Sequence, residues 1–421
     1  MRKFLFGSVF VLLPILATAQ TGDRDRALAT PLADLIAVLE AANPELAAAR
    51  HETDASIARI LPAGAPPDPT ISAGYMSGFL RPPFFPSSNT PDGLWQFGVS
   101  QQIPYPGKLA AKSALAASVA ERTRSVIDVK HVALIAALKT AYADLNLAER
   151  SLAILDGTRA VLEQARSAAE ARFRVGRGPQ QDVLRAQLEV SILSERVTIL
   201  RRDRSLALAA VNAVLGRAPD LPISAAPIAI EDLPPISELQ RLAVEQNPRI
   251  RRDEQQIAVG QAALTVARKE ILPDFGVNVF TQRKVGGMPW MYGVDLMATV
   301  PVFRQRKQRP MVAEATAMLG AAREMREATK VEAFAELAAA TAEAAAGREL
   351  MTLYDDSILP QARLALESSE ASYQTGTVDF LSLLANVTSV LTYEVAAEQQ
   401  RAVYVRALAR IEPLTGLSLI R

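Results

Sequence analysis

The sequence contains no cysteine and only two histidines among its 421 residues. The lack of cysteine excludes disulfide bonds, thiolate metal sites and cysteine nucleophiles. His51 and His131 fall within helical patterns, and neither belongs to a His-Glu-x-x-His motif, so packing or surface roles explain them better than metal binding. We therefore expect a protein that is not an enzyme and that holds no metal and no cofactor.

The chain is also poor in aromatic residues, in net charge and in long apolar runs. Aromatic residues make up 5% of the sequence, and the formal net charge is +1. A nearly neutral chain is a poor partner for a polyanion, so we expect no binding to nucleic acid. After residue 19 there is no stretch of about twenty apolar residues, so we expect no transmembrane helix in the mature chain.

Residues 1–19 have the pattern of a secretory signal peptide. Arg2 and Lys3 form a basic start, residues 4–16 are apolar, and residues 17–19 form a small-residue cleavage site. A membrane anchor is the alternative, but this apolar run is short for crossing a bilayer. Cleavage leaves 44 basic and 45 acidic residues, a formal charge of −1. Because no cysteine follows the cleavage site, we expect no lipid anchor.

The two halves of the chain share landmarks in the same order, about 200 residues apart. The pairs are Asn43 and Asn247, Trp95 and Trp290, Ile103–Lys108 and Val300–Lys307, Phe173–Gly176 and Tyr373–Gly376, and Leu215–Pro219 and Leu414–Ser418. Such self-similarity indicates an internal duplication. We predict a first structural repeat over 20–217, a second over 236–421, and an extended linker with five prolines over 218–235.

Each repeat contains two long segments with helical patterns. The predicted helices span 109–175 and 179–215 in the first repeat and 308–375 and 378–414 in the second. At about 1.5 Å per residue the longer ones reach roughly 100 Å. Their many alanines favour helix and allow close approach, so we expect these helices to pair along their length as in a coiled coil.

Four shorter segments alternate between apolar and polar residues, which is the pattern of β-strands. They span 70–79, 94–103, 274–282 and 290–300. Their polar faces are rich in Gly, Ser, Gln, Asn and Asp, and each segment is long enough for a tilted strand across a bilayer. Two hairpins on a soluble core are the alternative.

Aromatic residues favour the membrane interpretation of these strands. Trp95 and Trp290 occupy the same end of equivalent strands, with Tyr75 and Tyr292 near those ends, as in an interfacial girdle. Four strands cannot close a barrel, and an open edge in lipid would leave backbone groups unpaired. Several chains must then share one barrel, and three chains would supply twelve strands.

The strand that ends at residue 103 leads into a Pro-Tyr-Pro-Gly-Lys stretch and then into a long helix. Pro104 and Pro106 hold the chain extended where strand pairing stops, and Gly107 permits a sharp turn. The second repeat keeps only Pro301 of this pattern. A phosphate loop is excluded because the earlier glycine is missing. We predict a joint between barrel and tube.

The breaks between paired helices carry helix-stop and helix-start residues. The first break combines two cations, a glycine and a proline, namely Arg172, Arg174, Gly176 and Pro179. The cations offset the negative end of the first helix, glycine suits the left-handed C′ position, and proline suits the first helical position. In the second break we expect Gly376 at C′ and Thr377 as the N-cap.

Taken together, these motifs resemble the TolC-like outer-membrane efflux family. The residues that match are NPEL, QQIPYPGK, FRVGRGPQQDVLRAQ, LGRAP and YQTGTVDFLSLLANV, in the family's order. The stretch IPYPGK resembles the subgroup of heavy-metal efflux systems. The resemblance implies a homotrimer in the outer membrane of a Gram-negative cell, with a twelve-stranded β-barrel continuous with a periplasmic tube of twelve helices.

The resemblance also implies a function and partners. The chain would be the passive exit duct of a tripartite efflux system or one related to type I secretion. It would dock on an inner-membrane pump through a periplasmic adaptor, also called a membrane fusion protein. The alternative is a periplasmic coiled-coil scaffold or adaptor with soluble hairpins.

Within the family, the helix-hairpin tips build the gate. Asp182 matches the family's gate aspartate, whereas Ser382 stands at the equivalent place in the second break and Asp379 lies three residues earlier. Stabilising the first turn of a helix is the alternative role of both carboxylates. The resemblance further implies that the adaptor docks on the tip turns, at Gly176, Gly178, Tyr373 and Gly376.

Overall fold

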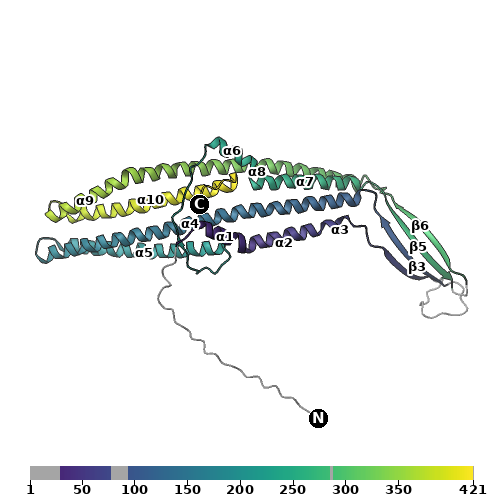
Figure 1. Cartoon of the computed structure of the whole chain (residues 1–421), viewed down its shortest axis with the longest axis horizontal. Helices are drawn as coiled ribbons and strands as arrows, with labels where there is room; N and C mark the ends of the chain where they lie inside the picture. Colours follow the sequence, from purple (N-terminus) through teal and green to yellow (C-terminus); the bar gives the residue numbers. More distant parts are fainter. Residues whose placement is uncertain (1–28, 77–92, 285–287, 421) are drawn as a thin grey trace, which may run out of the picture.

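The computed structural model describes residues 29–76, 93–284 and 288–420. The predicted signal peptide and the last three residues of the strand expected over 70–79 lie outside these ranges. The described chain is elongated, with a sheet at one end and paired helices along the rest of its length (Figure 1). The C-terminus lies near the middle of the long axis (Figure 1).

Four antiparallel strands form the sheet, in the order β2-β3-β5-β6. They are β2 (Thr70–Met76), β3 (Leu94–Ile103), β5 (Asp274–Lys284) and β6 (Met291–Thr299). These are the segments in which a two-residue alternation predicts strands. The central β3–β5 pair joins the two halves of the chain, and β2 and β6 are the edges of the sheet.

The register separates an apolar face from a polar one. One row across the sheet consists of Ile71, Val99, Val279 and Val294, which are between 48% and 81% exposed. The neighbouring row, on the opposite face, consists of Ser72, Gly98, Phe280 and Gly293. Nothing in the described chain covers the apolar face, which is the expected property of a surface that meets lipid or another apolar partner.

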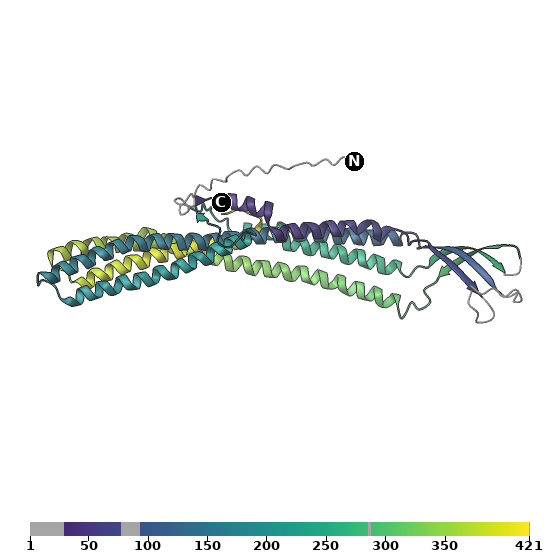
Figure 2. The same cartoon turned by 90° about the horizontal axis from the view of Figure 1, so that it is seen from below.

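The helices begin and end within two residues of the expected ranges. The first pair is α4 (Lys108–Arg174) and α5 (Gln180–Val214), and the second is α8 (Gln308–Leu353), its continuation α9 (Leu359–Thr375), and α10 (Phe380–Thr415). The half nearer the sheet also contains α2 (Pro44–Ala58), α3 (Ile60–Gly64) and α7 (Pro248–Lys269). Figure 2 shows the two hairpins side by side at the end away from the sheet.

The helix expected over 308–375 is interrupted by one π-helical turn at Tyr354–Ile358. Pro360 follows directly, at the second residue of α9. Proline has no N–H and its ring collides with the carbonyl four residues earlier, so the chain widens locally instead of continuing as an α-helix. The expectation of one regular helix is therefore wrong at this position.

The two Asn-Pro landmarks both start helices. Asn43 accepts hydrogen bonds from the backbone N–H groups of Glu45 (2.8 Å) and Leu46 (3.1 Å), which caps α2. Asn247 accepts one from Arg249 at 2.9 Å, which caps α7. In each case proline occupies the first helical position, where its missing N–H costs nothing.

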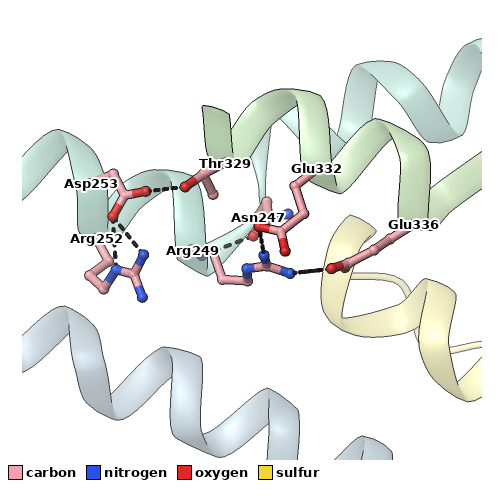
Figure 3. Close-up of polar contacts among 7 residues, drawn as sticks. All are labelled: Asn247, Arg249, Arg252, Asp253, Thr329, Glu332 and Glu336. Carbon is pink, nitrogen blue, oxygen red and sulfur yellow. Dashed lines mark hydrogen bonds and ion pairs between the residues drawn. The ribbon is translucent and has the colours of Figure 1, made fainter. Parts of the chain in front are cut away.

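Polar side chains join α7 to α8 (Figure 3). Arg249 reaches Glu336 at 2.8 Å and also pairs with Glu332. Nearer the sheet, Thr329 donates to Asp253 at 2.6 Å, and both side chains are 5% exposed. These bonds favour one lengthwise register of α7 on α8, because a slip by one turn would keep the Arg252 pair of Asp253 but break its buried bond to Thr329.

The main core lies near the middle of the long axis, where α4, α8 and α10 meet α1 (Leu32–Ala42) and α6 (Ile236–Glu245). Gly347 of α8 lies so close to α10 that an added Cβ would be 3.4 Å from the Tyr404 backbone. By length and composition α10 is the one described helix that could cross a membrane. Part of its apolar surface packs in this core and in a second one near the tips.

Candidate functional site

Both helix hairpins turn in the same way at their tips. After α4, the Gly176 N–H bonds to the Phe173 carbonyl and the Arg177 N–H to the Arg172 carbonyl. After α9, Gly376 and Thr377 repeat these two bonds to Tyr373 and Ser372. Both glycines have the expected left-handed conformation, with φ of 71° and 81°. Gly176 follows the C-cap Val175 and so occupies C′, whereas Gly376 is itself the C-cap of α9.

The residues that begin the outgoing helices differ from the expected ones. Pro179 is the N-cap of α5 and not its first helical residue. Asp379, not Thr377, caps α10, because its carboxylate accepts the Ser382 N–H at 3.0 Å. The Thr377 hydroxyl instead donates to the Ser372 carbonyl, which keeps it within the preceding turn. Helix capping therefore accounts for Asp379, and Ser382 supplies the capped N–H.

Arg172 connects the two tips. Its Nη1 donates to the Tyr373 carbonyl at 2.9 Å, and its guanidinium lies 4.6 Å from the centre of the Tyr373 ring. That ring is 6% exposed and lies 5.6 Å from the ring of Phe380 at the start of α10. A Cβ at Gly376 would be 3.3 Å from Arg172 Nη2, so a side chain there would crowd this contact. One arginine thus joins two hairpins about 200 residues apart in sequence.

The two tip carboxylates have opposite pKa shifts. Partial burial raises the pKa of Asp182; nearby Arg172 acts to lower it, and the charge of Asp379 raises it further. The hydrogen bonds from Ser382 lower the pKa of Asp379. Asp182, Arg172 and Asp379 therefore form one electrostatic cluster across the tips, and Asp182 takes up a proton at higher pH than Asp379.

The remaining tip residues have simpler surroundings. Arg174 is exposed, and no carboxylate of the described chain lies within ion-pair distance of it. Gly178 lies against Arg172, since a Cβ there would be 3.3 Å from the arginine Cβ. We call Arg172, Asp182, Tyr373, Gly376, Asp379 and Phe380 the tip cluster.

At the opposite end of the molecule, three of the four expected interface aromatics lie together. Tyr75 and Trp95 have ring centres 4.9 Å apart, and Phe97 lies 6.4 Å from both Trp95 and Trp290. Trp290 precedes β6 by one residue. Tyr292 is 81% exposed on the apolar face of the sheet.

The joint after β3 contains an ion-pair cluster that sequence reasoning missed. Gly107, where a sharp turn is expected, has a left-handed φ of 86°, and Pro104 and Pro106 precede it outside any regular element. Lys108 is only 3% exposed and lies 2.9 Å from Asp274 and 3.5 Å from Glu270. Asp274 also accepts the Tyr105 N–H at 2.9 Å. The start of α4 is thereby tied to the start of β5.

The chain shares its fold with outer-membrane channels of known structure. The chain superimposes on the outer-membrane channel OprN with a TM-score of 0.77 at 21% identity, over 92% of this chain and 90% of that one. VceC from Vibrio cholerae gives 0.76 at 17% identity, over 92% and 96%. CusC gives 0.78 at 16% identity, over 98% of each chain. Identities this low show the shared fold alone.

The sequence identifies the family. The model of the family described as outer membrane efflux protein matches residues 35–217 and 239–417. Since these ranges cover most of the chain, the protein belongs to the outer membrane efflux protein family. A search of curated proteins finds no match.

Proposed function

We propose that three copies of the chain form a passive exit duct through the outer membrane and across the periplasm. The two-faced sheet carries this proposal: its apolar face is uncovered, and both edge strands lack a partner within the described chain. Three such sheets joined edge to edge would form a closed barrel of twelve strands, which leaves no unpaired edge in lipid. The helices would continue that barrel into a tube.

We propose further that this duct is the outer-membrane part of a tripartite assembly. The tips, at the far end from the sheet, would face an inner-membrane pump and a periplasmic adaptor. The adaptor would dock on the two glycine turns, including Gly178. The two ranges matched by the family model also support a duplication with repeats over 20–217 and 236–421 and a linker over 218–235.

Fractionation of cells that make the full chain tests the proposed duct. We expect the protein in the outer-membrane fraction, soluble only in detergent, with the mass of a trimer after cross-linking. Osmotic shock would release a periplasmic scaffold without detergent, and that result would refute the duct. Residues 103–108 resemble the heavy-metal efflux subgroup, and the export of metal ions stays a prediction. Growth of a deletion strain on a panel of metals and drugs would test it.

The tip cluster is proposed as the gate, with Asp182 as its pH-sensitive group. A carboxyl with a raised pKa stabilises the folded arrangement below its ordinary pKa and loses this contribution as the pH rises through the raised value. Acidification from pH ~7 to ~4 should therefore favour the tip arrangement described here and change the open probability in planar bilayers. Asp182→Asn should remove this pH response. Asp379→Asn is the comparison variant: it keeps a capping side chain and Asp182 itself but removes a charge that raises the Asp182 pKa, so the response should persist and move to lower pH.

The bore of the barrel is expected to depend on Gly293. The outer end of the Phe280 ring lies over this glycine on the polar face, and a Cβ at residue 293 would be 2.4 Å from Phe280 Cζ. Gly293→Ala should lift the ring into the lumen and lower single-channel conductance, to roughly half or less if three rings rise together. Phe280→Ala combined with Gly293→Ala should restore it. Equal conductance of wild type and Gly293→Ala would place Phe280 away from the narrow part of the pore.

A further inference from the structure

The segment that joins β6 to α8 carries an exposed basic and apolar surface. We call residues 300–309 the basic joint. Its four cations are Arg304, Arg306, Lys307 and Arg309, and no acidic residue occurs between Asp295 and Glu314. Two large apolar side chains next to the cations, Val302 and Phe303, are 75% and 71% exposed. This combination of like charges and exposed apolar groups needs an explanation outside the fold of one chain.

The four charges do not stabilise the described chain. None of them has a carboxylate within ion-pair distance among the described residues, and Arg309 contacts only the neutral Gln305, at 2.7 Å. Lys307 caps α8 and Arg309 lies in its first turn, where positive charge opposes the helix dipole. The backbone is nevertheless ordered, since the Lys307 N–H bonds to Phe303 at 3.0 Å and the Arg309 N–H to Arg304 at 2.9 Å. An ordered loop thus presents four unneutralised cations.

The equivalent joint of the first half is neutralised within the chain. Lys108 is buried there against Asp274 and Glu270, and Lys112 lies 3.1 Å from Glu270. Both joints lie between a strand and a long helix. The first joint buries and pairs its first lysine, whereas the basic joint exposes its cations. The basic joint is therefore not a general requirement of the strand-to-helix turn.

The basic joint follows directly on the strand that carries the exposed apolar edge of the sheet. Val294 and Leu296 of β6 are 65% and 82% exposed on that face. β6 ends at Thr299, and Val300 and Val302 follow it with 55% and 75% exposure around a tight turn in which the Val302 N–H bonds to the Val300 carbonyl. Along this surface, apolar strand residues are followed by an aromatic residue and then by cations. The same order of chemistry is found across a membrane leaflet, from the acyl chains to the charged headgroups. Cations near an anionic membrane surface contribute attraction individually, and guanidinium groups bind phosphate in a bidentate way.

We propose that the basic joint binds the headgroups of anionic phospholipids in the periplasmic leaflet of the outer membrane, with Val302 and Phe303 entering the acyl boundary. This inference rests on the proposed membrane barrel. The contact anchors the barrel-to-tube joint at the membrane surface without a covalent lipid.

The test uses the full-length trimer purified in a neutral detergent. Native mass spectrometry measures retention of added phosphatidylglycerol against phosphatidylcholine. We expect the wild type to prefer phosphatidylglycerol, and Arg304→Gln/Arg306→Gln/Lys307→Gln/Arg309→Gln to bind it at least about tenfold more weakly. Molar salt should weaken wild-type binding in the same direction. The control, Arg185→Gln/Arg196→Gln/Arg201→Gln/Arg323→Gln, removes four other exposed cations and should bind as the wild type does.

Three outcomes overturn the proposal. The first is equal retention of the two lipids by the wild type, and the second is unchanged phosphatidylglycerol binding by the basic-joint variant. The third is dissociation of that variant into monomers while the control stays trimeric, because the cations would then pair with a neighbouring copy. Failure of the duct itself is seen separately, since a wild-type chain that is soluble without detergent and does not conduct refutes the barrel before lipid is added.

Discussion

Replacing Lys139 with methionine is expected to lower the free energy of unfolding by about 3–5 kcal/mol. Lys139 of α4 and Glu412 of α10 are 3% and 7% exposed and lie 2.6 Å apart in the core near the middle of the molecule. Without the ammonium group, the carboxylate of Glu412 would stay buried and uncompensated. Thermal unfolding of the detergent-solubilised protein, followed by circular dichroism, measures the effect.

The rescue variant is chosen from the other bonds of Glu412. Its Oε1 accepts the N–H groups of Leu419 and Ile420 at 2.7 and 2.8 Å, which holds the C-terminal segment against the core. Lys139→Met combined with Glu412→Gln removes both charges and keeps an acceptor for these N–H groups, so it should regain most of the lost stability. If the double variant is as unstable as Lys139→Met alone, the cause is lost packing or the lost bond from Lys139 to the Ile420 carbonyl, which is 3.0 Å long, and not the unpaired charge.

A surface ion pair provides the matched control. Arg363 and Glu394 lie 2.7 Å apart, but the arginine is 61% exposed. Water solvates either partner when the other is removed, so Arg363→Met should cost less than about 1 kcal/mol. The difference between the two methionine variants isolates the effect of burial.

Local patterns were sufficient to predict most elements of this fold. The two-residue alternation located β3, and the helix-forming run after Gly107 located α4, because both signals act over a few neighbouring residues. The glycines at the tips could be predicted for the same reason, since only the immediate turn decides their φ. Where two capping residues stand close together, as Thr377 and Asp379 do, sequence alone does not decide which one caps the helix.

The contacts that join the two halves could not be predicted. Lys108 meets carboxylates more than 160 residues away, and Lys139 meets Glu412 across 273. Charged residues of this kind usually lie at the surface, so burial of the lysine can be seen only once the helices are placed. The link from Arg172 to Tyr373 has the same character. The position of Arg172 at the end of α4 could be predicted from the sequence, whereas its partner Tyr373 on α9 could not.

The π-helical turn was not predicted, although the sequence contains a local signal for it. Pro360 stands within the range 308–375 and could have indicated a break. The strong helical pattern on both sides outweighed it, and the structure contains both features, a continuous rod with one widened turn. Where a proline interrupts a strong helical pattern, the chain can therefore keep the helix and widen one turn, an outcome that neither signal predicts alone.

Replacing Arg172 with alanine is expected to open the tips. The side chain supplies a charged hydrogen bond to the Tyr373 carbonyl and a cation–π contact to its ring. Loss of a hydrogen bond from a charged donor costs about 1.5–3 kcal/mol, which shifts the balance between joined and separated hairpins by roughly tenfold or more. Under the proposed gating role, single-channel conductance or open probability in planar bilayers should rise accordingly.

Two controls separate gating from general damage to the tip. Arg174→Ala removes an exposed cation from the same helical turn and should leave conductance unchanged. Tyr373→Phe keeps the ring and the backbone carbonyl, so it should behave as the wild type, whereas Tyr373→Leu removes the ring and should open the tips in part. If Arg172→Ala and Arg174→Ala conduct alike while both remain trimeric, the bridge between the hairpins is structural only. Conductance that rises in Arg172→Ala alone would identify Arg172 as the side chain that holds the two hairpins together in the closed tip.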